Sequence, residues 1–383
     1  MKLTVEKGPF LKALSHGQSV VEKRTTVPIL SHVLVSASAE GLSLTSTDMD
    51  MALIETIPAQ VEESSTTCVQ AHLLHEVVRK LSDRTPISLV VDHEKGHMVI
   101  TSGRSRFELP CLDPTDFPQI TQSELSHYFP LPAPVLKLLI DKTKFSMSGE
   151  EARFHLNGIH FHQLKSDDGR EILRTVATDM HRLACVDCDS PEAAIGMPGV
   201  IVGRKTITEV RKLLDEANKP ITVGLSNARI EFAIEGDGTR SVLSSRLVDG
   251  TFPDYQGAIT VENDKSLIVH TKAFAEAVDR VGTVVNDKVR AIKARVTENQ
   301  VLISAVSNEL GSATEELDVD FAYEEPIEVC FNVRYLMDIA QQIETEEMEI
   351  LLADGDSLAL IRAAGKNAAE NNNATFVLMP MRV

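Results

Sequence analysis

The sequence is poor in aromatic residues and contains no tryptophan. Phe, Tyr and Trp together make up 4% of its 383 residues, and Tyr occurs only four times. Proteins that bind single-stranded nucleic acid without sequence preference stack the bases on aromatic side chains. The composition therefore argues against a protein of that class.

Disulfide frameworks, long apolar runs and a leader-like segment are missing as well. The five cysteines have no framework spacing, which is typical of a reducing compartment. No apolar run reaches the length of a transmembrane helix, and the opening MKLTVEKGPFLKALS lacks the apolar centre of a signal peptide. We therefore expect a cytoplasmic protein that does not enter a membrane.

Positive charge is scarce, because 38 Lys and Arg stand against 56 Asp and Glu, which gives a net charge of −18. Such a balance disfavours a polyanionic partner for the molecule as a whole. The acidic excess is uneven, since residues 1–126 carry −5, residues 127–260 carry −2 and residues 261–383 carry −11. The distribution of charge is therefore more informative than its sum.

A motif that occurs three times is the most informative feature present. In each copy an alternating apolar stretch runs into a small hydroxyl residue that is followed by Asp or Asn. The copies are GLSLTSTDMD (41–50), EILRTVATDMHRLA (171–184) and QVLISAVSNELGSA (300–313). Their hydroxyl residues Thr47, Thr178 and Ser307 are 131 and 129 residues apart. A period of this length indicates three copies of a whole domain.

We therefore predict three similar α+β domains, at 1–126, 127–260 and 261–383. Within each copy the order is helix, several strands, helix, several strands, and strands that follow one another in runs favour antiparallel sheets. Apolar residues at helical spacing predict the two helices of each copy. These helices are expected at 10–14, 71–81, 135–145, 204–214, 272–281 and 332–343.

Five of the predicted helices place basic side chains opposite an apolar stripe. In 204–214, for example, Ile207, Val210 and Leu214 form the stripe. Lysines on the free faces of several helices, in an acidic chain, favour contact with phosphates, and the absence of base-reading Arg, Asn and Gln predicts binding independent of sequence. The lysines concerned are Lys12, Lys137, Lys144, Lys205 and Lys212.

Seven short strings follow one another along the whole chain: MKLTVEK (1–7), RTTVPIL (24–30), SGRSRFEL (102–109), LNGI (156–159), RTVATDMHRLA (174–184), RLVDGTFPDY (246–255) and MPMRV (379–383). Together with the triplicated frame, they resemble the beta-subunit family of bacterial DNA polymerase III, the sliding clamps. The resemblance implies a non-catalytic processivity factor without a cofactor or a metal. It also implies a DNA clamp fold, in which each domain has two helices on antiparallel sheets and each chain forms half of a dimeric ring around duplex DNA.

A geometric estimate agrees with two chains per ring. Six helices packed about 10 Å apart enclose an opening of only about 9 Å, whereas twelve helices leave about 28 Å. The two groove depths of B-DNA already sum to about 16 Å. The resemblance implies a head-to-tail homodimer, and we expect Arg104 and Arg106 of one chain to meet Glu315 or Glu316 of the other.

The resemblance further implies a pocket beside the second and third domains for short apolar peptides of the replicative DNA polymerase, the clamp loader and repair proteins. The residues carried over are Leu156, Thr178, His181, Arg182, Leu183, Pro253, Val377, Met379, Pro380, Met381 and Arg382. The arginines are expected to hold peptide carbonyls or carboxylates. Met180 stands where the family usually has Gly, and Gly257–Ala258 replace a basic and an apolar residue. We therefore expect a narrower and less cationic pocket.

For duplex DNA, the resemblance implies contacts from a loop arginine, Arg24, and a channel lysine, Lys205. Phe154 and His155 lie in a segment that corresponds to another DNA-contacting loop, where they replace a pair of tyrosines.

Three other interpretations remain open from the residues alone. Asp179 and His181 lie two residues apart and would suit a hydrolase, although Asp48 and Asn308 occupy the same place in the repeat without a histidine. A scaffold that binds only proteins would explain the pocket without DNA. Cys185 and Cys188 form one C-x-x-C pair, but a closed zinc site needs four ligands.

Overall fold

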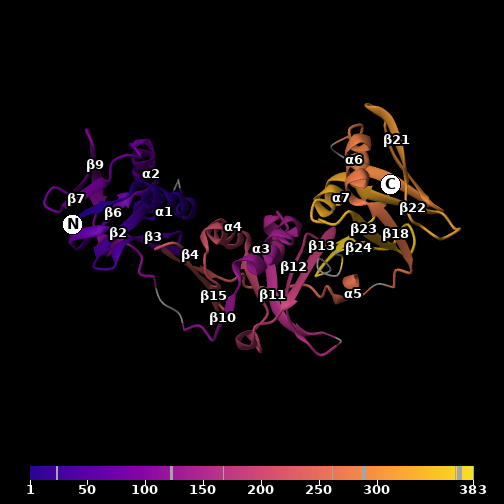
Figure 1. Ribbon diagram of the computed structural model, residues 1–383, viewed down its shortest axis with the longest axis horizontal. Coiled ribbons are helices and arrows are strands. Elements are labelled where there is room, and N and C mark those ends of the chain that lie inside the picture. The colour runs from indigo at the N-terminus through magenta and orange to yellow at the C-terminus, as the bar shows by residue number, and fades with distance from the viewer. Residues whose placement is uncertain are drawn as a thin grey trace. The chain divides into compact units, whose positions relative to one another are not determined.

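The computed structural model describes residues 1–22, 25–120, 124–166, 168–260, 262–286, 290–366, 368 and 373–382 (Figure 1). The chain forms two compact units. The first unit comprises residues 1–137 and 190–249, and the second comprises residues 138–189 and 250–383. Each unit therefore contains part of the predicted middle domain, while the predicted boundaries at 126/127 and 260/261 stay a prediction.

The first unit is built on one antiparallel sheet in the order β10-β15-β16-β17-β4-β3-β2-β6-β9-β8-β7-β1-β5. Its strands are β1 (Lys2–Val5), β2 (His32–Ser38), β3 (Gly41–Thr47), β4 (Met51–Ile57), β5 (Gln60–Glu63), β6 (Ser65–Gln70), β7 (Ile87–Asp92), β8 (His97–Ser102), β9 (Ser105–Leu112), β10 (His127–Leu131), β15 (Ile221–Leu225), β16 (Arg229–Glu235) and β17 (Arg240–Arg246). The unit also contains strand β14 (Val200–Gly203). Its helices are α1 (Lys7–Val20), α2 (Ala71–Lys80) and α4 (Arg204–Leu213), with short 3₁₀ turns η1 (Pro28–Ser31), η2 (Pro114–Asp116), η5 (Glu192–Ala194) and η6 (Leu214–Glu216).

The second unit contains two antiparallel arrangements of strands. One has the order β11-β12-β13-β25-β24-β23-β18, and the other has the order β21-β20-β19-β22. The strands of the first are β11 (Gly158–Lys165), β12 (Glu171–Thr178), β13 (Arg182–Asp189), β18 (Lys265–His270), β23 (Glu347–Leu352), β24 (Ala359–Ala364) and β25 (Ala374–Leu378). Those of the second are β19 (Ala291–Thr297), β20 (Gln300–Ser307), β21 (Gly311–Asp318) and β22 (Ile327–Asn332). The helices are α5 (Gln256–Ile259), α6 (Thr271–Gly282) and α7 (Val333–Ala340), with η3 (Lys144–Ser146) and η4 (Glu151–Leu156), and α3 (Ala133–Asp141) crosses from the first unit into the second.

The six predicted helices form, and their apolar stripes are buried. Leu136, Leu139 and Ile140 of α3 are fully buried, as is Val210 of α4, and Ile207 is almost so. In the first unit α1 packs against α2, and in the second α6 packs against α7 (Figure 1). The periodicity of the sequence thus placed the helices correctly, because each helix buries only one face. Within the described part of the chain, none of the helices combines the length and apolarity needed to cross a lipid bilayer.

The repeated hydroxyl–acid motif forms the turn of a β-hairpin. Thr178 Oγ1 donates a hydrogen bond to the carbonyl of Arg182 (2.7 Å) and accepts one from the amide of Met180 (3.0 Å). Thr47 makes the same pair of bonds with the carbonyl of Met51 (2.8 Å) and the amide of Met49 (3.0 Å). These turns satisfy buried polar groups with side chains, which explains why the motif recurs.

The aspartates of the motif serve the same turns. Asp48 Oδ1 accepts from the amides of Asp50 (3.0 Å) and Met51 (2.7 Å). Asp179 Oδ1 accepts from the amides of His181 and Arg182, both at 3.0 Å. The carboxylate that suggested a hydrolase therefore has a structural task that its counterpart in the first copy also performs.

Strand pairing joins consecutive repeats within each unit. In the first unit β4, the strand after the first turn, pairs with β17 in a register that places Ala52 opposite Ser244. In the second unit β13, the strand after the second turn, pairs with β25 and places Leu183 opposite Val377. The strand after the turn thus pairs with the last strand of the next repeat in both cases.

A partly buried charged cluster lies where the first two repeats meet. The ring of His16 on α1 lies between two carboxylates, with Nδ1 3.1 Å from Glu55 Oε1 and Nε2 3.2 Å from Glu216 Oε1. Lys12 also contacts Glu216 (2.8 Å), and the hydroxyl of Ser241 donates to Glu55 Oε1 (2.9 Å). Burial alone would lower the pKa of His16, but the hydrogen bonds to Glu216 and Glu55 outweigh it and raise this pKa to about 9. His16 is therefore a buried cation at neutral pH.

Because of this cluster, we expect the protein to lose stability as the pH becomes alkaline. The pKa of His16 lies above the ordinary value of 6.5, so its contribution is fully present below pH 6.5 and is lost as pH rises through about 9. A shift of this size corresponds to a few kcal/mol, on the order of 3. We expect the urea midpoint of the wild type to fall over this pH range more steeply than that of His16→Gln. His97→Gln, on the exposed start of β8, serves as the control, and equal slopes for wild type and His16→Gln would contradict the assignment.

Candidate functional site

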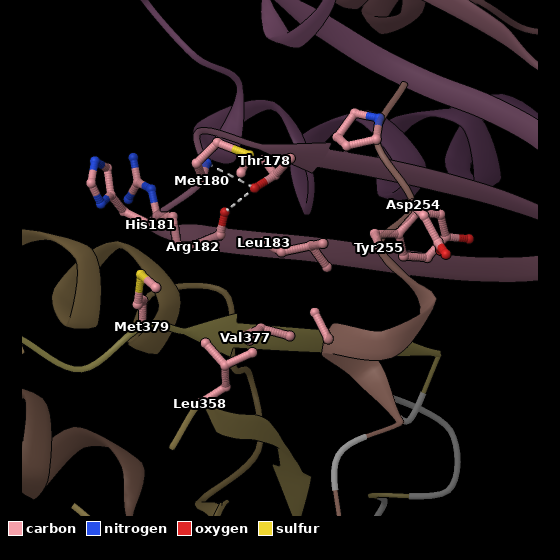
Figure 2. A pocket seen from close by; sticks show the side chains of 12 residues that line it. Thr178, Met180, His181, Arg182, Leu183, Asp254, Tyr255, Leu358, Val377 and Met379 are labelled. Carbon is pink, nitrogen blue, oxygen red and sulfur yellow. Dashed lines mark hydrogen bonds between the residues drawn. The ribbon is translucent and has the colours of Figure 1, made fainter. Parts of the chain in front are cut away.

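A small apolar pocket lies at the end of strands β13 and β25 in the second unit (Figure 2). The antiparallel pairing of these strands brings the second turn next to the C-terminal segment, and the amide of Met379 donates to the carbonyl of His181 (2.9 Å). The cavity has a volume of about 180 Å³. Its lining residues are Thr178, Met180, His181, Arg182, Leu183, Pro253, Asp254, Tyr255, Ala258, Leu358, Val377 and Met379.

Arg182 holds one side of this pocket in place. Its side chain is only 8% exposed, and Nη1 contacts Asp338 Oδ2 of α7 at 2.5 Å. Nε donates to Asp179 Oδ2 (3.2 Å) and Nη2 donates to the carbonyl of Phe145 (2.7 Å). The guanidinium also lies over the rings of Phe145 (5.1 Å) and Tyr335 (4.5 Å). All three guanidinium nitrogens thus have partners within the chain, so Arg182 is better suited to positioning the turn than to holding a peptide carbonyl.

A stack of rings supports the loop that carries Pro253 and Tyr255. The ring of Phe252 stacks on His160 (centroids 4.8 Å apart), and His160 stacks on His162 (4.4 Å). The hydroxyl of Tyr255 and Nε2 of His162 are 2.8 Å apart. Burial lowers the pKa of His162 to about 3 and raises the pKa of Tyr255 to about 12. Both side chains are therefore neutral at physiological pH, which allows them to pack together inside the protein.

The C-terminal segment continues from the pocket into a second, wider cavity of about 790 Å³. The backbone of this segment is fixed again at Met381, whose amide donates to the carbonyl of Cys330 (2.7 Å). Arg382 is largely exposed and lies 3.9 Å from Asp356. The second cavity shares Leu358 and Met379 with the first and is also lined by Glu262, Asn263, Ala353, Asp356, Ser357, Pro380 and Arg382.

Most of the predicted pocket residues are therefore brought together. Seven of them line the first cavity, and Pro380 and Arg382 line the second. Met381 lies beside them, whereas Leu156 is buried in η4 outside both sets of lining residues. The other lining residues are Met180 and Ala258, which the sequence analysis named as departures from the family pattern, and Asp254, Tyr255 and Leu358, which it did not assign to the pocket.

The structure pairs each of the predicted DNA-facing lysines with a carboxylate. Lys205 Nζ contacts Asp48 and donates to the carbonyl of Val20 (2.8 Å). The other pairs are Lys12–Glu216, Lys137–Asp215, Lys144–Asp141 and Lys212–Glu209. Phe154 is exposed and lies edge-on to the ring of His155. Arg24 lies outside the described residues.

The predicted dimer contacts lie on or beside β21, which is the edge strand of its sheet, and β9, which pairs with β6 only at its C-terminal end. Arg104 precedes β9, and Arg106 within β9 pairs with Glu108 (2.5 Å). On β21, Glu315 accepts two hydrogen bonds from Arg280 (2.6 and 3.0 Å), and Glu316 is exposed.

The cysteine pair is part of strand β13. Cys185 is buried and Cys188 is half-buried, and burial raises the pKa of both thiols to about 12. Residues three apart on a strand point to opposite faces, so the two sulfurs do not converge on one ion. Among the described residues, no three His, Cys, Asp or Glu side chains are grouped as metal ligands would be.

Comparisons with known proteins cover the chain from end to end. Three family models match it: the N-terminal domain of the DNA polymerase III beta subunit over residues 1–121, the central domain over 130–254 and the C-terminal domain over 258–382. The beta sliding clamps of Caulobacter vibrioides and Escherichia coli K12 are 41% and 34% identical to it, and each alignment covers 100% of both chains.

Solved structures agree with this result. A sliding clamp from Bartonella birtlesii bound to griselimycin has a TM-score of 0.93 and 42% identity, and the match covers 100% of both chains. The beta subunit from Caulobacter crescentus has a TM-score of 0.92 and 41% identity. The predicted α+β clamp fold of three domains is confirmed by these similarities. The chain belongs to the beta-subunit family of bacterial DNA polymerase III, the sliding clamps, and is a non-catalytic processivity subunit of that polymerase.

Proposed function

We propose that two copies of this chain join head to tail into a ring that encircles duplex DNA, in the cytoplasm of a bacterium. The ring slides along DNA and holds the replicative polymerase, the clamp loader and repair proteins through short apolar peptides that enter the pocket at β13 and β25. The observation that carries this proposal is the strand pairing between repeats, which occurs twice within the chain. It leaves the last strand of the first repeat and the strand after the turn of the third repeat without a partner of this kind.

The two strands left over are β9 and β21. By their place in the repeat, β9 corresponds to β17 and β21 corresponds to β4. In the described part of the chain β21 pairs only with β20, and β9 pairs with β6 only through its last two residues. Open edges of this kind readily accept another strand, so β21 of one copy and β9 of a second copy are natural partners.

The internal pairs also suggest a register for this contact. Thr47 lies opposite Ala52 in its hairpin, and Ala52 in turn lies opposite Ser244. The corresponding residue of the third hairpin is Gly311, which lies opposite Ser307. Matching Arg104–Ser105 with Arg240–Ser241 makes Glu108 the counterpart of Ser244. Antiparallel pairing from Gly311 opposite Glu108 then places Thr314 opposite Ser105 and Glu315 opposite Arg104.

A disulfide test addresses this register directly. We expect the double variant Ser105→Cys/Thr314→Cys to form covalent dimers under mild oxidation, because facing residues of paired strands have Cα atoms about 4.5–5.5 Å apart. Each single-cysteine variant is the control for the native thiols. Gel electrophoresis without reductant, alongside sedimentation of the wild type, gives the readout. A wild type that sediments only as a monomer would refute the ring, whereas a dimer without cross-links would refute the register.

Lysines on the surfaces of the helices support the DNA part of the proposal. The lysines of α1, α3 and α4 each have a carboxylate nearby, so their charge is partly balanced and would attract phosphates only loosely. Loose contact suits a ring that must move along the duplex, since strong phosphate binding would hold it in one place. Lys205 remains about half exposed despite its contact with Asp48.

Charge reversal on this surface should impair loading on DNA. We expect Arg24→Glu/Lys205→Glu to reduce loading onto nicked circular DNA by the clamp loader by about tenfold or more, because each lost phosphate contact weakens binding. Peptide binding should be unchanged. Lys219→Glu, which reverses a surface lysine paired with Glu235, is the matched control. Loading equal to that of the wild type would remove the two residues from the DNA surface.

The C-terminal segment is the natural place to test the pocket. Deletion of residues 379–383 removes Met379 from its lining, so we expect peptide and polymerase binding to be lost while the dimer persists. Fluorescence anisotropy with a labelled peptide that contains a Leu-Leu pair measures the first effect, and sedimentation measures the second. Loss of the dimer on deletion would show that the segment is mainly structural.

Retention on circular and on cut DNA distinguishes a ring from a scaffold that binds only proteins. A ring loaded on nicked circular DNA should be retained there and should be released when the circle is cut, because a free end allows it to slide off. A protein-only scaffold would show no difference between the two forms of DNA.

A further inference from the structure

Two methionines of this chain occupy a backbone conformation that favours glycine. Met49 has φ 82° and Met180 has φ 74°, and each follows the Thr-Asp pair of its hairpin turn. Their amides donate to the preceding threonine hydroxyls at the same distance of 3.0 Å. Their side chains are also similarly exposed, at 55% and 53%. The two positions are thus nearly identical in local structure.

A side chain in the left-handed region costs free energy relative to glycine. The turn itself would therefore form more easily with glycine at either position. Strain of this kind is often kept where a side chain serves a function. The surroundings of the two methionines show where such a function is possible.

The first two repeats meet at the pairing of β4 with β17, and the second and third meet at the pairing of β13 with β25. These two junctions differ in what lies beside the methionine. At the first, the amide of Arg246 donates to the carbonyl of Asp50 (2.9 Å), and the side chains of these residues form an ion pair (3.4 Å). At the second, Met379 makes the same backbone bond to His181 (2.9 Å), and an apolar cavity replaces the ion pair. Met180 lines this cavity and lies on the turn, while Met379 lies on the C-terminal segment (Figure 2).

We propose that Met180 is a specificity-determining residue of the peptide site, and that its side chain packs over an apolar side chain of the bound partner. This inference rests on the proposed peptide-binding function and adds a residue to it. Met180 and Met379, which is 48% exposed, are two flexible thioether side chains at one pocket. Unbranched methionines adapt to apolar ligands of different shape, so together they would pack around an aliphatic side chain of the bound peptide.

The charges at the pocket agree with an apolar occupant. The guanidinium of Arg182 is already bonded to Asp179, Asp338 and the carbonyl of Phe145. Arg182 is therefore largely occupied within the chain, and we expect the apolar side chains of the lining to supply most of the affinity for a peptide. Because about half of the Met180 side chain is exposed in the free protein, its burial by a ligand contributes hydrophobic stabilisation that glycine cannot supply.

The chain provides its own control for this inference, because Met49 shares the turn but not the pocket. The probe is a fluorescein-labelled octapeptide with a central Leu-Leu pair in a Gly/Ser background, and an Ala-Ala version reports non-specific binding. We expect Met180→Gly to weaken binding of the Leu-Leu peptide about five- to tenfold. Met180→Leu should stay within about twofold of the wild type, because it restores most of the apolar surface.

Met49→Gly should bind the peptide as the wild type does. Both glycine variants should shift the melting temperature alike, since they relieve the same backbone conformation. Equal affinity of Met180→Gly and the wild type would overturn the inference and leave the proposed peptide site intact. A wild type that does not distinguish the Leu-Leu from the Ala-Ala peptide would instead refute the peptide site itself.

Discussion

Pairing between the strand after each hairpin turn and the last strand of the following repeat is the constraint on which this structure depends. It makes the first two repeats share one continuous sheet through β4 and β17, and it joins the second and third repeats through β13 and β25. A strand with an open edge leaves backbone donors and acceptors unpaired, so this pairing stabilises each unit and orders the repeats. The same rule leaves β21 and most of β9 without a partner on one side, and the proposed dimer would pair these two strands.

The two junctions use this common frame for different purposes. Around the first, charged groups predominate: Lys205 contacts Asp48, Ser19 donates to Glu209 (2.5 Å), and His16 bridges Glu55 and Glu216. At the second, the buried Arg182 is satisfied by Asp179 and Asp338, and the space beside it is apolar. A buried cation whose three guanidinium nitrogens are each hydrogen-bonded within the chain fixes the turn, and its charge is balanced by Asp179 and Asp338. The backbone bonds are thus equivalent at the two junctions. The side chains around them differ, which accounts for a pocket at one junction and an ion pair at the other.

Much of the fold was predictable because it depends on local patterns. Helical periodicity placed α3 and α4 correctly, and the repeated Thr-Asp strings marked equivalent positions of the repeats, which are hairpin turns in the structure. The pocket was predicted in part, since the family resemblance supplied positions such as Leu183 and Met379. The place of Leu358 in the pocket could not be predicted, because it depends on the pairing of β24 with β25. No short-range pattern in the sequence specifies this pairing. The contact between Arg182 and Asp338 could not be predicted either, because Asp338 lies 156 residues further along the chain.

The scarcity of aromatic residues has a practical consequence at the pocket. With no tryptophan in the chain, its ultraviolet emission comes from four tyrosines. Tyr255 lines the cavity, and Tyr335 lies against His181 and the guanidinium of Arg182. Half of the intrinsic fluorophores therefore sit at the proposed ligand site or directly beside it. The molecule carries a spectroscopic reporter of occupancy that needs neither a dye nor an engineered probe.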